Sequence, residues 1–189
     1  MAAAVEQIDY GMFIMPFHPP EKPFSQSFDE DLELIVRAEE LGFKEFWIGE
    51  HHTMKYEPIV MPEIFIARAL GDTSKIRLGP APVCLNQHHP AFVARVLAFL
   101  DHLAKGRLNL CFGNGSVTAD HELYGIDPKD GGAMALEAID VILDLWSHDP
   151  PYSHKGKFWQ FELKKTVDDE CLIGHINKPY QLPHPPTSM

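Results

Sequence analysis

The sequence has few cysteines and no long apolar run. Its three cysteines are Cys84, Cys111 and Cys171, with neither a CxxC pair nor a regular spacing. An odd, scattered set argues against a disulfide framework and a structural zinc site, and it favours the reducing cytoplasm. No apolar run approaches the roughly 20 residues that cross a bilayer. Residues 1–6 lack the basic and apolar regions of a signal peptide, so we expect neither secretion nor a membrane.

Positive charge is also scarce. The chain carries 16 lysines and arginines against 27 aspartates and glutamates, a formal net charge of −11. This balance repels nucleic acid and anionic lipid, so neither is an expected partner. The apolar fraction of 45% and the charged fraction of 23% are ordinary for a globular protein. A chain of 189 residues can bury one core, so we expect a single domain over residues 1–189.

Short apolar runs alternate with helical patterns along the chain. The runs are continuous, as in parallel strands buried on both faces, and we expect strands at residues 8–15, 44–48, 76–85 and 107–112. Helices are expected between them, at about residues 27–41, 62–70, 90–103 and 133–146. A capping box at Ser27 opens the first helix, Gly42 ends it, and Pro62 and Pro90 open the next two.

This order predicts an α/β fold of the (β/α) TIM-barrel type that is incomplete, with about four of eight β/α units. Strand onsets recur at a regular spacing, as in a barrel, and no G-x-G-x-x-G follows the first strand, as a dinucleotide-binding sheet would require. The four units occupy residues 1–147. Residues 148–189 are expected to form a hairpin that turns near Lys155-Gly156, followed by an irregular proline-rich tail without a further strand.

Polar residues follow each expected strand. In a barrel the loops after the strands hold the active site, which places His18, Glu50-His51-His52, Asn86 to His89 and Gly113-Asn114-Gly115 at one rim. Histidine suits proton transfer at neutral pH, and glycine lets the backbone approach a flat ligand.

Simpler interpretations of these residues stay open. Glu50-His51-His52 could be a solvated strand cap, and His88-His89 could only introduce the helix at Pro90. Residues 120–122 fit a solvated loop, and Cys84 and Cys111 fit buried packing. The histidines could also bind the metal of a barrel hydrolase, although neither an H-x-H after the first strand nor an H-E-x-x-H is present.

Several segments, taken in order, resemble the luciferase-like flavin-dependent monooxygenases. The resemblance runs from about Asp9 to Pro186, over the N-terminal half of that family. It is carried by Tyr10-Gly11-Met12-Phe13, Phe46-Trp47-Ile48-Gly49-Glu50-His51-His52, Ile76-Arg77-Leu78-Gly79-Pro80-Ala81-Pro82-Val83, His89-Pro90, Lys105-Gly106-Arg107, Gly113-Asn114-Gly115 and Gly156-Lys157-Phe158-Trp159.

The resemblance implies a reaction and a cofactor. Family members bind flavin mononucleotide (FMN), reduced by a separate flavin reductase, and form a flavin hydroperoxide with O2. One oxygen atom then passes to a small organic substrate. It also implies that His51 is catalytic and that His52 and Glu50 orient it. Because the metal motifs are missing, we expect no metal site. The implied cofactor-binding residues are Ala81, Pro82, Val83, Gly113, Asn114 and Gly115.

Further expectations follow from the alignment. The flavin of the family lies against a strained peptide bond that aligns with Ala81–Pro82, and we expect this bond to be cis, because proline lowers the energy of that isomer. Luciferase has arginine where this chain has Asn114, which puts phosphate binding by that residue in doubt. The run at Pro183 leads toward a fifth strand, which we expect to be missing. In the family, that strand and later loops hold most of the flavin phosphate, so activity should be impaired.

Family dimers pack helices of this half, which implies a homodimer through residues 62–70 and 90–103. Three alternatives remain: a non-catalytic relative that binds flavin or dimerises, a member of the deazaflavin-dependent branch, and a metal-dependent barrel hydrolase.

Overall fold

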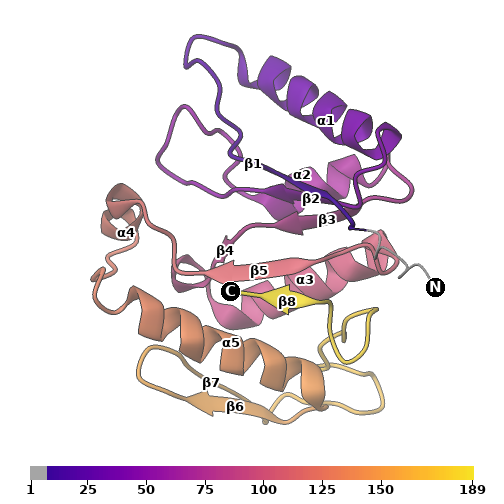
Figure 1. The fold of residues 1–189 in the computed structure, drawn as a ribbon. Coiled ribbons are helices and arrows are strands. Elements are labelled where there is room, and N and C mark those ends of the chain that lie inside the picture. Colours follow the sequence, from indigo (N-terminus) through magenta and orange to yellow (C-terminus); the bar gives the residue numbers. More distant parts are fainter. Residues whose placement is uncertain (1–7) are drawn as a thin grey trace, which may run out of the picture.

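Strands and helices alternate along the chain (Figure 1). The computed structural model describes residues 8–189, so the expectation that residues 1–6 form no signal peptide falls outside it. The β/α units comprise β1 (Gly11–Ile14), α1 (Phe24–Glu40), β2 (Glu45–Ile48), α2 (Pro62–Ala69), β3 (Arg77–Pro80), β4 (Val83–Cys84), the short 3-10 helix η1 (Leu85–Gln87), α3 (Pro90–Ala104), β5 (Leu110–Gly113), α4 (Thr118–Leu123) and α5 (Gly131–Ser147). The chain ends with β6 (Tyr152–Lys155), β7 (Gln160–Leu163) and β8 (Thr187–Ser188).

The strands of the β/α units are parallel and lie side by side in chain order. β1 pairs with β2 and β2 with β3, and Leu78 of β3 bridges to Leu108 just before β5. β4 pairs with β5, again in parallel. A doubly wound sheet would reverse its strand order at a switch point, whereas a barrel keeps strands in sequence. The predicted α/β fold with barrel-like units is therefore confirmed.

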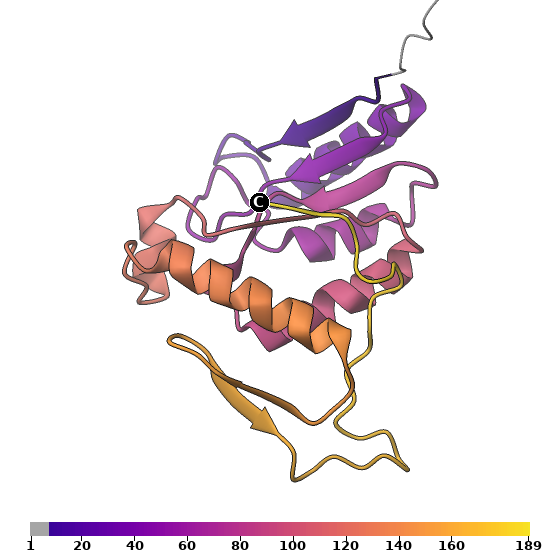
Figure 2. The ribbon, with the colours of Figure 1, turned by 60° about the horizontal axis from the view of Figure 1, so that its bottom comes forward.

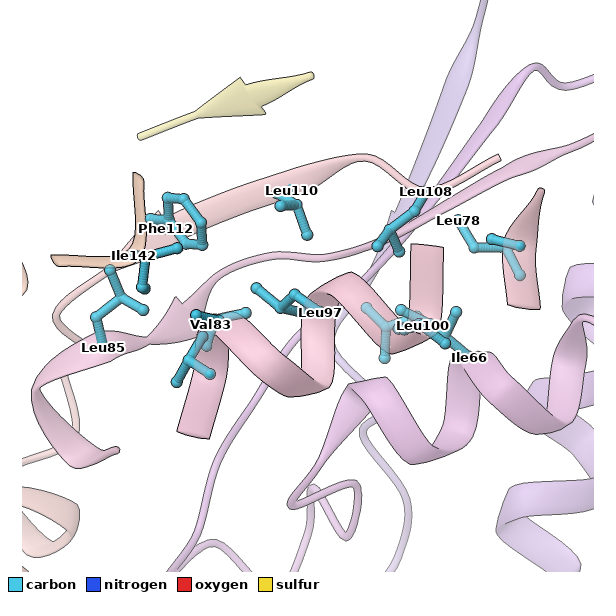
Figure 3. Packing of buried hydrophobic residues seen from close by; sticks show 14 of the residues in the cluster. Ile66, Leu78, Val83, Leu85, Leu97, Leu100, Leu108, Leu110, Phe112 and Ile142 are labelled. Carbon is cyan, nitrogen blue, oxygen red and sulfur yellow. The ribbon is translucent and has the colours of Figure 1, made fainter. Parts of the chain in front are cut away.

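The core lies between this sheet and the helices. Phe46 and Ile48 of β2 are fully buried. Figure 3 shows Leu97 of α3 beside Val83 of β4 and Leu110 of β5. Figure 2 shows α3 and α5 running together along one side of the sheet. Each fully buried leucine or isoleucine stabilises the fold by about 1.5–3 kcal/mol relative to an exposed one, so this layer holds the strands in register.

The opposite face of the sheet is only partly buried in this chain. Phe13 of β1 is 52% exposed. Neighbouring polar groups on this face bond to one another: Asn109 donates to Glu45 Oε1 at 2.8 Å, and Trp47 Nε1 donates to Glu45 Oε2 at 3.1 Å. The apolar runs predicted burial on both faces, and the structure differs because no further element covers this side within residues 8–189.

The third expected strand, at residues 76–85, is divided. β3 ends at Pro80 and β4 starts at Val83, with a cis peptide bond between Ala81 and Pro82. Proline has no N–H, so a continuous ladder of backbone hydrogen bonds cannot run through position 82. The apolar pattern alone did not reveal this break, but the predicted cis bond is confirmed.

The first helix starts earlier than the capping box indicated. α1 begins at Phe24 after Pro23, and Ser27 is a buried residue of its first turns rather than the cap. The Ser27 hydroxyl instead lies 3.5 Å from the Pro23 carbonyl oxygen. The stop was predicted correctly: Gly42 has a φ of +90°, which glycine adopts without strain.

Two segments predicted as irregular contain regular structure. Residues 120–122, expected in a solvated loop, belong to α4, where Asp120 is 2% exposed and His121 is 5% exposed. The expectation of no strand after the hairpin is also wrong, because β8 pairs in parallel with β5. The Leu110 N–H donates to the Pro186 carbonyl at 2.9 Å, so β8 supplies partners to backbone groups that the edge of β5 would otherwise expose.

The predicted hairpin is confirmed. β6 and β7 are antiparallel, and the Gly156 N–H donates to the Trp159 carbonyl across the turn. The carboxylate of Glu137 on α5 accepts hydrogen bonds from backbone N–H groups of this turn, including that of Trp159 at 2.9 Å, and so joins the hairpin to the helix.

Among the described residues, no helix has both the length and the apolar character needed to span a bilayer.

A second carboxylate joins two β/α units on the side away from the strand ends. Glu39 near the end of α1 accepts the N–H groups of Ser74, Lys75 and Ile76, the last two at 2.7 and 2.8 Å. Burial raises the pKa of Glu39, but these hydrogen bonds outweigh it and lower that pKa to about 2. The group therefore stabilises the fold above its unfolded-state pKa, and that contribution is lost as the pH falls toward about 2.

We predict that Glu39→Gln lowers the free energy of unfolding at neutral pH by about 1–3 kcal/mol, because charge-assisted hydrogen bonds are lost. The matched control is Glu40→Gln, whose carboxylate pairs on the surface with Arg37 and should change stability by less than about 0.5 kcal/mol. Urea denaturation at several pH values measures both. The wild-type advantage should shrink as the pH drops below about 4.5; an advantage that is constant with pH would contradict this role for Glu39.

Candidate active site

The ends of β1, β2, β4 and β5 surround one cavity of about 440 Å³. Its lining residues are Phe13, Met15, Gly49, Glu50, His51, Ala81, Pro82, Cys84, Cys111, Phe112, Gly113, Asn114, Gly115, Ser116 and Met189. Parallel strands end at the same edge of a sheet, which is why loops far apart in the sequence meet here. Seven of the nine catalytic and cofactor-binding residues that the resemblance implied are thus gathered at one place.

Two of the nine catalytic and cofactor-binding residues that the resemblance implied lie elsewhere, and so do His18 and residues 86–89, which were expected at the same rim. Val83 is fully buried and its side chain belongs to the core rather than to the cavity wall (Figure 3). The side chain of His52 turns away from the cavity lining toward Glu50 and Tyr124. An apolar run of residues does not indicate which of them faces the cavity, so these two orientations were not predicted.

One wall of the cavity is formed by Pro82 packed against Gly113. A Cβ atom at Gly113 would lie 2.8 Å from Pro82 Cγ, closer than such atoms approach. Gly115 has a φ of +64°, and a Cβ there would lie 2.9 Å from Gln87 Nε2. The absence of a side chain at Gly113 lets the loop after β5 approach Pro82, and at Gly115 it lets the same loop approach Gln87 and Cys84.

His51 lies at the rim between two buried carboxylates. Its Nε2 is 3.3 Å from Glu57 Oε2, and its Nδ1 is 3.8 Å from Asp120 Oδ2. Glu57 is 5% exposed and Asp120 is 2% exposed. The resemblance implied that His52 and Glu50 orient His51, but the carboxylates beside its imidazole are those of Glu57 and Asp120.

Glu50 is instead the centre of a separate buried network. Its Oε1 accepts from His52 Nε2 at 2.6 Å and from His88 Nε2 at 2.7 Å, and its Oε2 accepts from the Cys84 N–H at 2.9 Å. Burial raises the pKa of Glu50, but the hydrogen bonds from His52, His88 and Cys84 outweigh it and lower that pKa to about 2. Glu50 is therefore an anion that anchors three segments.

His88 and His89 were expected at the rim, with a helix entry as the simpler interpretation, and the structure divides this pair. His89 caps α3, with its Nδ1 accepting the Ala91 N–H at 3.2 Å, while His88 points to Glu50. Burial alone lowers the pKa of His88, yet the hydrogen bond to Glu50 and the charges of Glu50 and Glu63 raise it. Burial and the charge of Glu50 raise the pKa of Glu63 to about 7.

The residues of this network are also of the types that bind metal ions. Glu50, His52 and His88 each offer a ligand atom, and these atoms lie within 4.8 Å of one another. A tetrahedral zinc ion with bonds of about 2.0–2.1 Å separates its ligands by roughly 3.3 Å. The separations here are 2.6 and 2.7 Å, as in direct hydrogen bonds. The geometry favours a hydrogen-bonded triad, and the absence of a functional metal stays a prediction.

The lining fits a flavin ring better than a flavin phosphate. Its walls are largely apolar, with Phe13, Pro82 and Phe112 beside backbone atoms of the glycine loop. Neither lysine nor arginine lines the cavity within the described part of the chain. A phosphate group carries negative charge and is normally held by arginine, lysine or free N–H groups. The residues present can therefore hold the ring, while the charged end would need groups from outside this lining.

Sequence reasoning missed Glu57, Tyr124 and Asp120. Tyr124 hydroxyl lies 2.5 Å from His52 Nδ1, and Asp120 accepts the Thr53 hydroxyl at 2.5 Å. No local motif marked these residues: Tyr124 and Asp120 have partners distant in the chain, and Glu57 meets His51 across a loop without regular structure. The one signal for Asp120 in the sequence is that neither lysine nor arginine occurs nearby, so it has no neighbour with which to form a surface ion pair.

Comparisons with known proteins agree with this geometry. The family model for luciferase-like monooxygenases matches residues 8–182. The 4-hydroxyprotoasukamycin monooxygenase of Streptomyces nodosus subsp. asukaensis is 42% identical over 147 residues, which cover 78% of this chain and 40% of that protein. The oxygenase component of a flavin-dependent trigonelline monooxygenase from Acinetobacter baylyi is 33% identical, with coverages of 85% and 42%.

A solved structure matches the fold. It is the oxygenating constituent of 3,6-diketocamphane monooxygenase from Pseudomonas putida, a type II Baeyer-Villiger monooxygenase in complex with FMN. The TM-score is 0.84 at 26% identity, over 94% of this chain and 49% of that one. The chain thus spans half or less of the length of these relatives. With the family model matching most of its length, the chain belongs to the luciferase-like monooxygenase family.

Proposed function

We propose that this chain forms the flavin-facing half of the active site of an FMN-dependent monooxygenase, which inserts one oxygen atom of O2 into a small organic substrate. The observation that carries the proposal is that His51, Pro82 and Asn114 line one cavity. The relatives support it: one has flavin in its name, and the structural match contains FMN. Reduced flavin would supply the electrons that activate O2; the residues of this chain would hold its ring and handle protons.

His51 is the residue that we assign to proton transfer. It lines the cavity, and its two ring nitrogens face the carboxylates of Glu57 and Asp120. A histidine at such a position can hold a proton at one nitrogen and exchange it at the other during the reaction. Glu50 and His52 support it indirectly, since they anchor the loop that carries it.

Ala81, Pro82, Gly113, Asn114 and Gly115 are the residues that we assign to the ring. Gly113 contacts Pro82 so closely that a Cβ at this position would displace the proline ring from the cavity wall. Val83 would act only by packing beneath this wall.

We predict that FMN and riboflavin bind the purified chain with dissociation constants within about threefold of each other, because no cation in the lining grips the phosphate. Gly113→Ala should weaken both by at least about tenfold, since its Cβ would collide with Pro82. The control is Gly132→Ala on α5, where a Cβ meets nothing within 4 Å. Flavin fluorescence titration measures these affinities, and the deazaflavin coenzyme is titrated in parallel.

The possible results separate the alternatives. A preference for FMN over riboflavin of more than about tenfold would contradict ring-only binding, because it requires a charged phosphate contact. Failure of both flavins to bind would leave the non-catalytic alternative. Tighter binding of deazaflavin would move the proposal to that branch.

We also predict that Glu50→Gln lowers the free energy of unfolding by about 1–3 kcal/mol and lowers the pKa of His88, because the anion between the two histidines is lost. Denaturant unfolding and NMR titration of the histidines measure the two effects. Glu122→Gln, an exposed position in α4, is the control. An unchanged His88 pKa in the Glu50 variant would show that Glu50 is not its charge partner.

The proposed partners are a flavin reductase, O2, an organic substrate and a second copy of the chain. The words "oxygenase component" in the name of the trigonelline enzyme support a separate reductase. Exposed apolar side chains on α2 and α3 support a dimer interface at residues 62–70 and 90–103: Ile64 is 65% exposed and Phe99 is 60% exposed. We further propose a cytoplasmic location, which the three free cysteines support.

We predict a dimer by analytical ultracentrifugation, and Ile64→Asp should convert it to a monomer, because a charge buried in the interface is strongly unfavourable. Leu136→Asp is the matched control, since Leu136 is a 55% exposed leucine on α5, outside the proposed interface. A monomeric wild-type chain, or dissociation by the Leu136 variant alone, would contradict this interface.

A further inference from the structure

α4 contacts two loops that line the cavity, the loop after β2 and the loop after β5. Adjacent residues of this short helix do so: Asp120 reaches the loop after β2, and His121 Nε2 lies 3.0 Å from the Asn114 carbonyl oxygen in the loop after β5. Tyr124, directly after α4, adds a contact to His52. A single element thus contacts both the histidine loop (residues 50–53) and the glycine loop (residues 113–115).

Asp120 uses both of its carboxylate oxygens on the histidine loop. Its Oδ1 accepts the Thr53 hydroxyl at 2.5 Å, and its Oδ2 accepts the His52 N–H at 3.3 Å. The same Oδ2 lies 3.8 Å from His51 Nδ1. Consecutive residues 51–53 therefore all face one carboxylate, which is 2% exposed. A side chain whose role was only to cap α4 would bond to backbone N–H groups of that helix, whereas the partners of Asp120 belong to residues 51–53.

Burial makes this arrangement rigid. An aspartate removed from water is stable as an anion only when polar groups satisfy its oxygens. Here those groups belong to the loop that carries His51, so moving the loop would leave Asp120 without partners. Glu57 restrains the imidazole from the other nitrogen, with its Oε2 3.3 Å from His51 Nε2.

We propose that Asp120 is a positioning residue for His51, and that α4 sets the place of the imidazole relative to the glycine loop. Asp120 fixes residues 51–53, and His121 fixes Asn114. This inference rests on the proposed function only for the role of His51 in proton transfer. The contacts of Asp120 and His121 do not depend on bound flavin.

The test uses substitutions that keep the size of the side chain. Asp120→Asn retains one oxygen to accept from the His52 N–H or the Thr53 hydroxyl, but it removes the anion beside His51 Nδ1. Asp127→Asn is the matched control, because Asp127 is an exposed aspartate of the same segment that bonds only the Lys129 N–H. The ¹⁵N resonances of the histidine rings, recorded without flavin, report the hydrogen bonding of each ring nitrogen.

We expect Asp120→Asn to shift both ring ¹⁵N resonances of His51, while those of His102, on the far side of the sheet, stay in place. Asp120→Glu, which restores the charge, should bring the His51 resonances part of the way back. Asp127→Asn should leave all histidine resonances unchanged. Thermal unfolding and circular dichroism verify that each variant is folded. A variant that fails to fold is replaced by Thr53→Val, which removes the hydroxyl that donates to Asp120 and leaves the carboxylate in place.

FMN titration of the same variants separates this inference from the proposed function. Unchanged His51 resonances in folded Asp120→Asn would overturn the inference, whether or not flavin binds. Shifted His51 resonances in a chain whose wild type binds no flavin would leave the inference standing and overturn the proposed function alone.

Discussion

The common direction of the strands is the constraint on which the rest of the structure depends. Because each strand returns through a helix on the same side of the sheet, β1, β2, β4 and β5 all deliver their carboxyl ends to one edge. The glycine loop, the Ala81–Pro82 segment and the histidine loop meet there without being near in sequence. The packing of leucine and isoleucine side chains behind the sheet keeps these ends in place, so the geometry of the cavity depends on the core (Figure 3).

The electrostatics around the cavity are unusual for a buried region. Four carboxylates, of Glu50, Glu57, Glu63 and Asp120, are each less than a tenth exposed. Glu50 accepts hydrogen bonds from a histidine and a backbone N–H group, Asp120 accepts one from a hydroxyl, and Glu57 lies beside His51. Burial and the charge of Glu50 raise the pKa of Glu63 to about 7, so the protonation of this carboxyl and of His88 sets the net charge of the region near neutral pH. Burial lowers the pKa of His88, but its hydrogen bond to Glu50 and the charges of Glu50 and Glu63 raise it and favour its protonated form.

The parts of the fold that depend on local chemistry could be predicted from the sequence. The helix stop at Gly42 and the helix that begins at Pro90 follow from residue type and short-range pattern, whereas the cis bond at Ala81–Pro82 was expected from the family resemblance together with the proline. The convergence of Glu50, His51 and Gly113 followed from the parallel order of the units. The cofactor and reaction, by contrast, came from resemblance rather than from any derivation.

Other features could not be predicted, because distant partners decide them. The sequence around Asp120 predicts a solvated loop, but in the folded chain its carboxylate accepts hydrogen bonds from Thr53 and His52. His88 and His89 are identical in type and adjacent, yet one meets Glu50 and the other caps α3. β8 forms because β5 offers a free edge, and its proline-rich approach carries no strand pattern of its own.

The most direct measurement is a crystal structure of the chain with riboflavin or FMN bound. Our account predicts that the tricyclic ring lies against Pro82 and Gly113, with His51 at its edge and the ribityl chain leading away from this lining. A ring bound elsewhere, such as the apolar groove formed by Phe28, Ile59 and Phe65 between α1 and α2, would contradict it.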